Sequence, residues 1–258
     1  MIDLHSHVLP NLDDGSRTLE HSIQMCRISH QDGIETIVAT PHILPGIYEN
    51  DRSTILFQVA KLNTALRNAS THSRIDASGF QSAIKILPGA DVHFSSDLLE
   101  RLKRKEIVTV NDQGRYLMVE FEFQGIPYQA EEVLFQLIAN GIIPIISHPE
   151  RNMEIGQRPQ RYYGMVQMGC LGQVTAMSLT GEFGPGIKRS AERLLAKRLI
   201  HLIASDAHSV DGRPPILSAG VEAAEKIIGK EEAQKMVTEY PKAVIEGRRP
   251  DVPEPLSP

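Results

Sequence analysis

The chain has 258 residues, of which 41% are hydrophobic and 23% charged, and this composition excludes wholesale disorder. It contains no apolar run of the ~20 residues that a membrane helix needs, and residues 1–10 lack the basic and apolar regions of a secretory signal. The net charge of −5 argues against nucleic acid as a partner, because proteins that bind it without sequence preference carry a basic excess. Two cysteines cannot build a disulfide framework, so we expect a cytoplasmic protein without membrane insertion.

Seven short runs of apolar or β-branched residues predict strands along the chain. Most of them are continuous apolar runs, which is the pattern of strands that are covered on both faces. In chain order, the predicted strands are 2–4, 35–39, 84–87, 117–122, 142–146, 171–174 and 201–204.

Between these runs, apolar residues recur with the period of a helix. Leu19, Ile23 and Cys26 predict a helix that Thr18 caps and that ends before Gly33. Three later helices are predicted at 55–66, 131–140 and 188–198. This alternation predicts an α/β fold with a parallel sheet. Seven strands favour a closed or nearly closed β/α barrel, with an open doubly wound sheet as the alternative.

Two segments lack a strand or helix pattern. Residues 69–82 are polar and rich in serine, which predicts a loop or a short insertion. Residues 250–258 contain four prolines, and we expect them to form a disordered tail. The expected organisation is therefore a single domain over residues 1–249, followed by this tail.

Metal-ligand side chains follow six of the seven predicted strands. Barrel enzymes carry their catalytic groups at the carboxyl ends of the strands, so we expect these side chains to converge. Only the sixth strand, which Thr175 follows, lacks a histidine or an acid at its end. The candidates are His5, His7, His42, Asp91, Glu120, Glu122, His148, Asp206 and His208.

The first and last strands both end in pairs of ligand-type residues. His5 and His7 are two residues apart, and so are Asp206 and His208. Side chains alternate along a strand with a period of two, so each pair projects to one side. Neutral imidazoles and carboxylates that converge from different elements are typical of a metal cluster. The sequence therefore predicts a metal site.

Loops next to the strand ends add further candidates. Asp13 and Asp14 precede Gly15, and they are either plain turn formers or close back over the first histidine pair. Of the two, we favour Asp14 as a metal ligand. Arg151 and Arg213 follow ligand positions within a few residues. Because guanidinium groups match the oxygens of a phosphate, these two arginines are candidates for binding one.

The two cysteines do not fit a thiol-dependent phosphatase. That chemistry needs an arginine at the sixth position after the cysteine, but Asp32 follows Cys26 there and Ala176 follows Cys170. Both cysteines are expected to be core residues. A covalent phosphocysteine is disfavoured on this ground.

The ordered set of motifs resembles the polymerase and histidinol phosphatase (PHP) superfamily. The motifs are DLHSHVLPNLDDGS at 3–16, ATPH at 39–42, PGAD at 88–91, SHPER at 147–151 and ASDAH at 204–208. Within this superfamily, LPNLDDG, SHPER and the DGRPP of 211–215 resemble the bacterial metal-dependent protein-tyrosine phosphatases of capsule and exopolysaccharide gene clusters. The resemblance covers residues 1–249.

The resemblance implies a distorted seven-stranded barrel around three divalent cations, commonly manganese, with iron, cobalt or zinc as other candidates. His5, His7 and Asp206 would bind the first cation. Glu120 and His148 would bind the second, Asp91 would bridge these two, and Asp14, His42 and His208 would bind the third. Arg151 and Arg213 match positions that contact the phosphate. The family usually has glutamate at the bridging position, and this chain has Asp91.

The activity implied by the resemblance is hydrolysis of phosphotyrosine by hydroxide formed on the cations, with His42 as a candidate to assist the leaving group. The implied substrate is the tyrosine-rich tail of a phosphorylated bacterial tyrosine kinase that controls polysaccharide export. Histidinol phosphate or another small phosphomonoester is one alternative substrate. A nuclease or polymerase-associated module with little phosphatase activity is another alternative. The oligomeric state is not implied.

Overall fold

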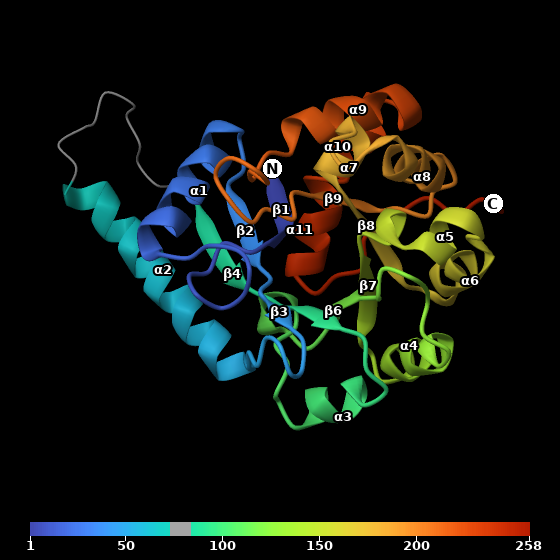
Figure 1. Ribbon diagram of the computed structural model, residues 1–258, viewed down its shortest axis with the longest axis horizontal. Helices are drawn as coiled ribbons and strands as arrows, with labels where there is room; N and C mark the ends of the chain where they lie inside the picture. Colours follow the sequence, from blue (N-terminus) through green and yellow to red (C-terminus); the bar gives the residue numbers. More distant parts are fainter. Residues whose placement is uncertain (73–83) are drawn as a thin grey trace.

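Nine parallel strands lie in two open sheets within residues 1–72 and 84–258, the part of the chain that this computed structural model describes (Figure 1). The first sheet has the order β1 (Ile2–Ser6), β2 (Thr36–Ala39) and β4 (Lys85–Pro88). The second has the order β3 (His42–Ile43), β5 (Asp91–His93), β6 (Tyr116–Glu120), β7 (Ile143–Ser147), β8 (Leu171–Thr175) and β9 (Leu202–Ala204). All seven predicted strand regions are strands, but they do not form the single closed seven-stranded sheet that was expected.

The strands divide into two sheets because the extended chain is interrupted at two places, between β2 and β3 and between β4 and β5. Pro41, between β2 and β3, has no N–H with which to continue a ladder, while its carbonyl accepts a hydrogen bond from Asp91 N at 3.2 Å. At Gly89, between β4 and β5, a Cβ atom would lie 2.6 Å from Val38 Cγ1. Glycine therefore allows the chain after β4 to approach β2 closely at this break. As a result, β3 and β5 pair only with the second sheet and begin with ligand-type residues.

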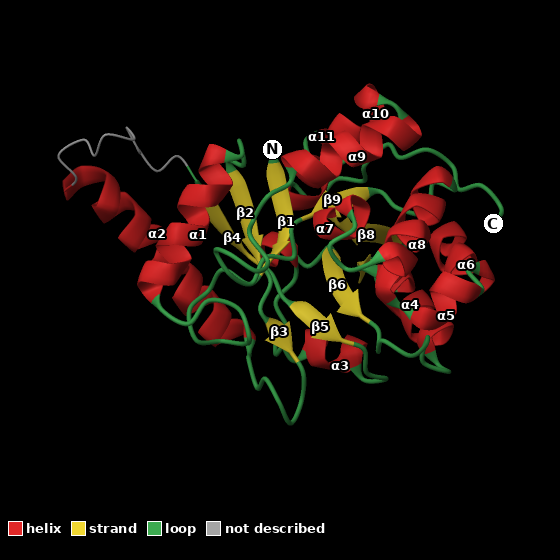
Figure 2. Ribbon diagram, turned by 45° about the horizontal axis from the view of Figure 1, so that its top comes forward, coloured by secondary structure: helices red, strands yellow, loops and turns green. Residues whose placement is uncertain are grey.

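The first and last strands bring the two sheets together. Ser6 and Ala207 form an isolated parallel bridge. His7 N donates to Ala207 O at 2.8 Å, and Asp206 N donates to His5 O at 2.8 Å. In Figure 2, β1 lies beside β9 with helices outside both sheets. The residues that follow these two strands are therefore neighbours in space.

Helices cover the outer faces of the sheets. Helices α1 (Leu19–Gln31) and α2 (Arg52–His72) lie on one side of the molecule in Figure 1, and α5 (Met153–Gln157), α6 (Gln160–Met168) and α8 (Pro185–Ala196) on the other. The remaining helices are α3 (Leu98–Lys103), α4 (Ala130–Ala139), α7 (Ala176–Thr180), α9 (Ser218–Ile228), α10 (Lys230–Lys235) and α11 (Glu239–Ile245), with 3-10 turns at Val110–Asp112 and Pro149–Arg151. None of the described helices has the length and apolar content to cross a membrane.

The sequence predicted four of the eleven described α-helices, and one predicted loop is partly helical. All four predicted helices are present, and Thr18 Oγ1 accepts a hydrogen bond from His21 N at 3.1 Å, which confirms the predicted cap of α1. Of the segment 69–82 that was expected to be a loop, residues 69–72 belong to α2, which continues to His72. The rest of that segment lies outside the described residues. The last residues, 250–258, have no regular structure, and Leu256 N donates to Lys197 O at 2.9 Å.

Candidate metal centre

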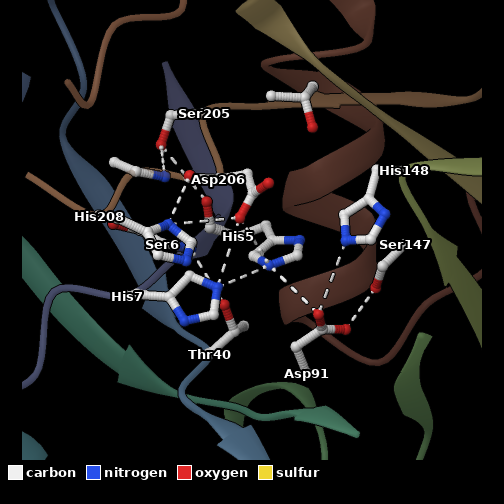
Figure 3. Close-up of polar contacts among 12 residues, drawn as sticks. His5, Ser6, His7, Thr40, Asp91, Ser147, His148, Ser205, Asp206 and His208 are labelled. Carbon is white, nitrogen blue, oxygen red and sulfur yellow. Dashed lines mark hydrogen bonds and ion pairs between the residues drawn. The ribbon is translucent and has the colours of Figure 1, made fainter. Parts of the chain in front are cut away.

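The nine side chains predicted as metal ligands gather where the strands end, and Figure 3 shows six of them: His5, His7, Asp91, His148, Asp206 and His208. Three groups have donor atoms that all lie within 4.8 Å of one another: His5, His7 and Asp206; His7, Asp14, His42 and His208; and His42, Asp91 and Glu120. Of the nine, His148 alone falls outside these groups, and its Nε2 is 3.4 Å from Glu120 Oε1. The further candidate Glu122 has a side chain that is 67% exposed, and it is not in these groups.

The first group has the spacing of ligands around one cation. His5 Nε2 and His7 Nε2 are 3.1 Å apart, and each is 3.4 Å from Asp206 Oδ1. Ligand atoms that bind one cation at about 2.1 Å lie about 3 to 3.5 Å apart. Burial lowers the pKa of His5 well below its ordinary value, so this imidazole is neutral, as a metal ligand must be. The donor set therefore fits a divalent cation.

Asp91 lies between the groups. Its Oδ1 accepts a hydrogen bond from Ser147 Oγ at 2.5 Å, whereas its buried Oδ2 has no hydrogen-bond partner. This Oδ2 is 3.6 Å from His5 Nε2, 3.7 Å from His42 Nδ1 and 3.9 Å from His148 Nε2. A buried, unpaired carboxylate oxygen is costly, and a nearby cation would remove that cost. The surroundings of Asp91 therefore fit a carboxylate shared between cations.

The two adjacent aspartates occupy different environments. Asp14 is half exposed, and its Oδ1 is 3.4 Å from His208 Nε2. Asp13 is buried, with Oδ2 2.6 Å from His7 Nδ1. Burial opposes protonation of His7, but the charge of Asp13 raises the pKa of this imidazole to about 10. Asp13 thereby fixes one proton on Nδ1, and a cation at Nε2 would have to displace the second proton of this imidazolium. The loop that carries Asp13 can lie this close to His7 because residue 15 is glycine. A Cβ there would be 2.3 Å from His7 O.

Other buried polar residues, which were not predicted from the sequence, orient the candidate ligands. Gln173 Oε1 is 2.9 Å from His5 Nδ1. Asp3 accepts hydrogen bonds from the N–H of Ser205 at 3.0 Å and from its hydroxyl at 2.5 Å, which fixes the residue before Asp206. The signal in the sequence is a polar residue inside an apolar strand, as Asp3 is in β1 and Gln173 in β8. A polar group that such a strand buries needs a hydrogen-bond partner.

Two candidate ligands have strained backbones. His148 has φ 33° and Asp206 has φ 52°, in the left-handed region that non-glycine residues seldom adopt. His148 directly follows β7, and Asp206 lies two residues after the end of β9. Such strain costs of order 1–3 kcal/mol and persists where the surrounding structure fixes it, commonly at functional sites. The local backbone turns both side chains toward the centre.

The two predicted phosphate-binding arginines meet beside this centre. Arg151 Nη2 is 2.6 Å and Arg213 Nη2 is 2.5 Å from Asp206 Oδ2, and the buried Nε atom of each has no hydrogen-bond partner. Burial would raise the pKa of Asp206, but the charges of Arg151 and Arg213 and a hydrogen bond with His7 hold this pKa well below its ordinary value. Phe183 packs on both guanidinium groups, with its ring centre 4.3 Å from Arg151 Cζ and 5.8 Å from Arg213 Cζ. Phe183 was not among the residues predicted from the sequence.

The cysteines lie in the core, as expected. Cys26 and Cys170 are buried, and burial raises the pKa of each thiol to about 12. Neither is a thiolate at neutral pH, so neither is an activated nucleophile. Neither cysteine can therefore act as a catalytic nucleophile.

The chain matches one family model over nearly its whole length. The model is that of capsular polysaccharide synthesis, CpsB/CapC, and it matches residues 1–246. The chain belongs to this family. It is 35% identical to the tyrosine-protein phosphatase YwqE of Bacillus subtilis over 231 residues, which cover 90% of this chain and 86% of YwqE. It is 29% identical to the tyrosine-protein phosphatase CpsB of Streptococcus pneumoniae over 250 residues, which cover 95% of this chain and 98% of CpsB.

Solved structures agree with this family assignment. One chain from the crystal structures of YwqE and CpsB, described as unique metal-dependent tyrosine phosphatases, superposes with a TM-score of 0.92 and 33% identity. The match covers 100% of this chain and 99% of that one. Histidinol phosphate phosphatase of Lactococcus lactis, crystallised with zinc, L-histidinol and phosphate, has a TM-score of 0.53 and 12% identity, with 92% of each chain covered. That second likeness shows a shared fold only.

Proposed function

We propose that this chain is a metal-dependent protein-tyrosine phosphatase, with residues 1–249 as the phosphatase domain and 250–258 as an appended tail. The observation that carries the proposal is the convergence of Arg151 and Arg213 on Asp206, a carboxylate that also belongs to a group of metal-ligand side chains. A phosphate bound by these guanidinium groups would lie directly against the cations. The phosphatase activity of the named relatives supports the same assignment.

The proposal includes three divalent cations, with manganese as the first candidate and iron, cobalt or zinc as alternatives. We assign His5, His7 and Asp206 to the first cation, Glu120 and His148 to the second, Asp91 as their bridge, and Asp14, His42 and His208 to the third. The distance of 3.5 Å between His42 Nδ1 and Glu120 Oε2 brings the second and third sets into contact. The cations would then lie where strands of both sheets end.

The roles of the side chains follow from this arrangement. Bound cations supply Lewis acidity and lower the pKa of water toward neutrality. Arg151 and Arg213 bind the phosphate oxygens and stabilise their charge during transfer, and Phe183 holds the two guanidinium planes in place. Burial lowers the pKa of His42 to about 4, so this proposed ligand is a neutral imidazole and could pass a proton to the leaving oxygen only from the ring nitrogen that does not hold the cation. Phenolate leaves readily, so this assistance is modest.

The proposed substrate is phosphotyrosine in the tyrosine-rich tail of a bacterial tyrosine kinase, and the proposed location is the cytoplasm. A flexible tail can present its phosphate to a centre at the rim of the sheets. The chain itself is acidic overall, with a net charge of −5, so attraction of an anionic substrate must be local.

Histidinol phosphate is the second candidate substrate, favoured by the fold shared with the L. lactis enzyme. The test compares kcat/KM of manganese-loaded protein on a phosphotyrosyl peptide, a phosphoseryl peptide and histidinol phosphate. We expect the phosphotyrosyl peptide to be preferred by about tenfold or more, because phenolate is the better leaving group. Equal or faster turnover of histidinol phosphate would overturn the assignment of substrate. Cleavage of nucleic acid without phosphatase activity would overturn the assignment of enzyme class.

A further inference from the structure

A groove runs away from the candidate metal centre along α5 and α8. It encloses about 590 Å³ and shares Phe123, Arg151 and Asn152 with a smaller cavity of about 130 Å³. The smaller cavity is lined by Glu120 and His148, two of the candidate metal ligands. The groove is therefore continuous with the place where the phosphate would bind.

The walls of the groove combine positive charge with apolar surface. Arg189 and Arg193 lie along it on α8, in addition to Arg151. Arg189 is exposed and has no ion pair in the part of the chain that the structure describes, while Arg193 Nη2 donates to the carbonyls of α5 residues. Phe123 and Met153 are 56% and 48% exposed at the same groove.

The acidic side chain of the groove lining is buried below its surface. Glu150 is the acidic residue that lines it, and this side chain is buried. Its Oε1 accepts hydrogen bonds from Thr175 N at 3.1 Å and from Ser178 Oγ at 2.6 Å. The surface that a ligand would meet is therefore cationic, although the whole chain carries a net charge of −5. Opposite charges on a ligand would be attracted to this groove rather than to the rest of the protein.

We propose that this groove binds the peptide segment next to the phosphotyrosine and that Arg189 selects substrates with acidic residues in that segment. The proposal rests on the proposed phosphatase function, because it places the phosphate on Arg151 at one end of the groove. The apolar side chains of Phe123 and Met153 contact the peptide, and Arg189 pairs with a carboxylate or with a second phosphate. An acidic protein thereby recognises an acidic substrate through one local surface.

The test uses the full, manganese-loaded chain and three phosphotyrosyl peptides that carry Asp, Asn or Lys two residues on either side of the phosphotyrosine. Arg189→Glu is compared with the matched control Lys61→Glu on α2, which lies on the opposite side of the molecule in Figure 1. Turnover of p-nitrophenyl phosphate, which cannot reach along the groove, reports the centre itself. Fluorescence anisotropy of labelled peptides reports binding without turnover.

The wild-type protein should prefer the Asp peptide over the Asn peptide by about fivefold in kcat/KM, and high salt should reduce this preference. Arg189→Glu should abolish the preference and favour the Lys peptide, with p-nitrophenyl phosphate turnover unchanged. Lys61→Glu should behave as the wild type. Equal turnover and binding of the three peptides by the wild type, or equal effects of the two variants, would overturn the groove assignment. If the manganese-loaded wild type hydrolysed neither the peptides nor p-nitrophenyl phosphate but still bound the Asp peptide selectively in anisotropy, the phosphatase function would be overturned and the groove assignment supported.

Discussion

Asp13 shows how a residue outside the candidate ligand set controls a ligand. Its carboxylate is 2.6 Å from His7 Nδ1 and also accepts a hydrogen bond from His42 N at 2.9 Å. It therefore orients two of the proposed ligands from behind. Such supporting carboxylates fix the tautomer of a metal-binding histidine and increase its basicity.

Asp13→Asn should weaken manganese binding while the ligands stay in place. The manganese concentration for half-maximal activity should rise about 10- to 100-fold, and saturating manganese should restore most of kcat. Asp14→Asn is the contrasting variant, because it alters a proposed ligand and should not be fully rescued. Metal titration of phosphotyrosyl peptide hydrolysis measures both. An unchanged titration curve for Asp13→Asn would contradict the role assigned to this carboxylate.

At the scale of elements, the loop between α7 and α8 positions Arg151 and Arg213, which belong to two other segments of the chain. Phe183 is the contact, and it packs on Arg151 and Arg213. The arginines themselves could be found from the sequence, because they follow strand-end motifs. Their partner could not be found, because it approaches in space from a loop without a recognisable pattern.

Phe183→Leu keeps an apolar side chain but removes the aromatic face. A cation–π contact contributes about 1 kcal/mol, so KM for phosphotyrosyl peptides and the inhibition constant of inorganic phosphate should each rise about fivefold. Metal content should not change. Phe135→Leu on α4, where Phe135 is 59% exposed, is the matched control. If the two variants gave the same kinetics, Phe183 would have no positioning role.

The division of the sheet is the element-scale feature that the sequence did not predict. Each predicted strand was found, but β3 and β5, which follow Pro41 and Gly89, were not predicted, and they join a different sheet from β2 and β4. A single apolar run carries no signal for such a change of partner. The strand-end histidines were predictable all the same, because β/α alternation fixes which end of each strand they occupy.

At the scale of the whole molecule, His201 connects stability with pH. Its Nδ1 accepts a hydrogen bond from Gly172 N at 2.9 Å, which joins β8 to the residue directly before β9. Burial lowers the pKa of His201 to about 4, from an ordinary value of 6.5. Between these values the unfolded chain binds a proton that the folded protein excludes. Its contribution to stability is therefore complete above pH 6.5 and lost as the pH falls toward 4.

Urea unfolding at pH 7.5 and pH 4.5 tests this linkage. His201 should account for up to about 3 kcal/mol of the wild-type loss of unfolding free energy between these pH values. His201→Asn keeps an acceptor for Gly172 N without a titrating ring, so its loss of stability over the same range should be smaller. Equal losses in the two proteins would mean that His201 does not titrate as its burial requires.

The central claim is that hydrolysis of phosphotyrosine depends on bound divalent cations and not on a thiol. The most direct measurement is phosphate release from a phosphotyrosyl peptide by chelated protein, before and after reloading with manganese, and after treatment with a thiol alkylating reagent. We expect no release after chelation, recovery with manganese, and no effect of alkylation, since Cys26 and Cys170 are buried. Full activity in the chelated protein, or its loss on alkylation alone, would contradict the account.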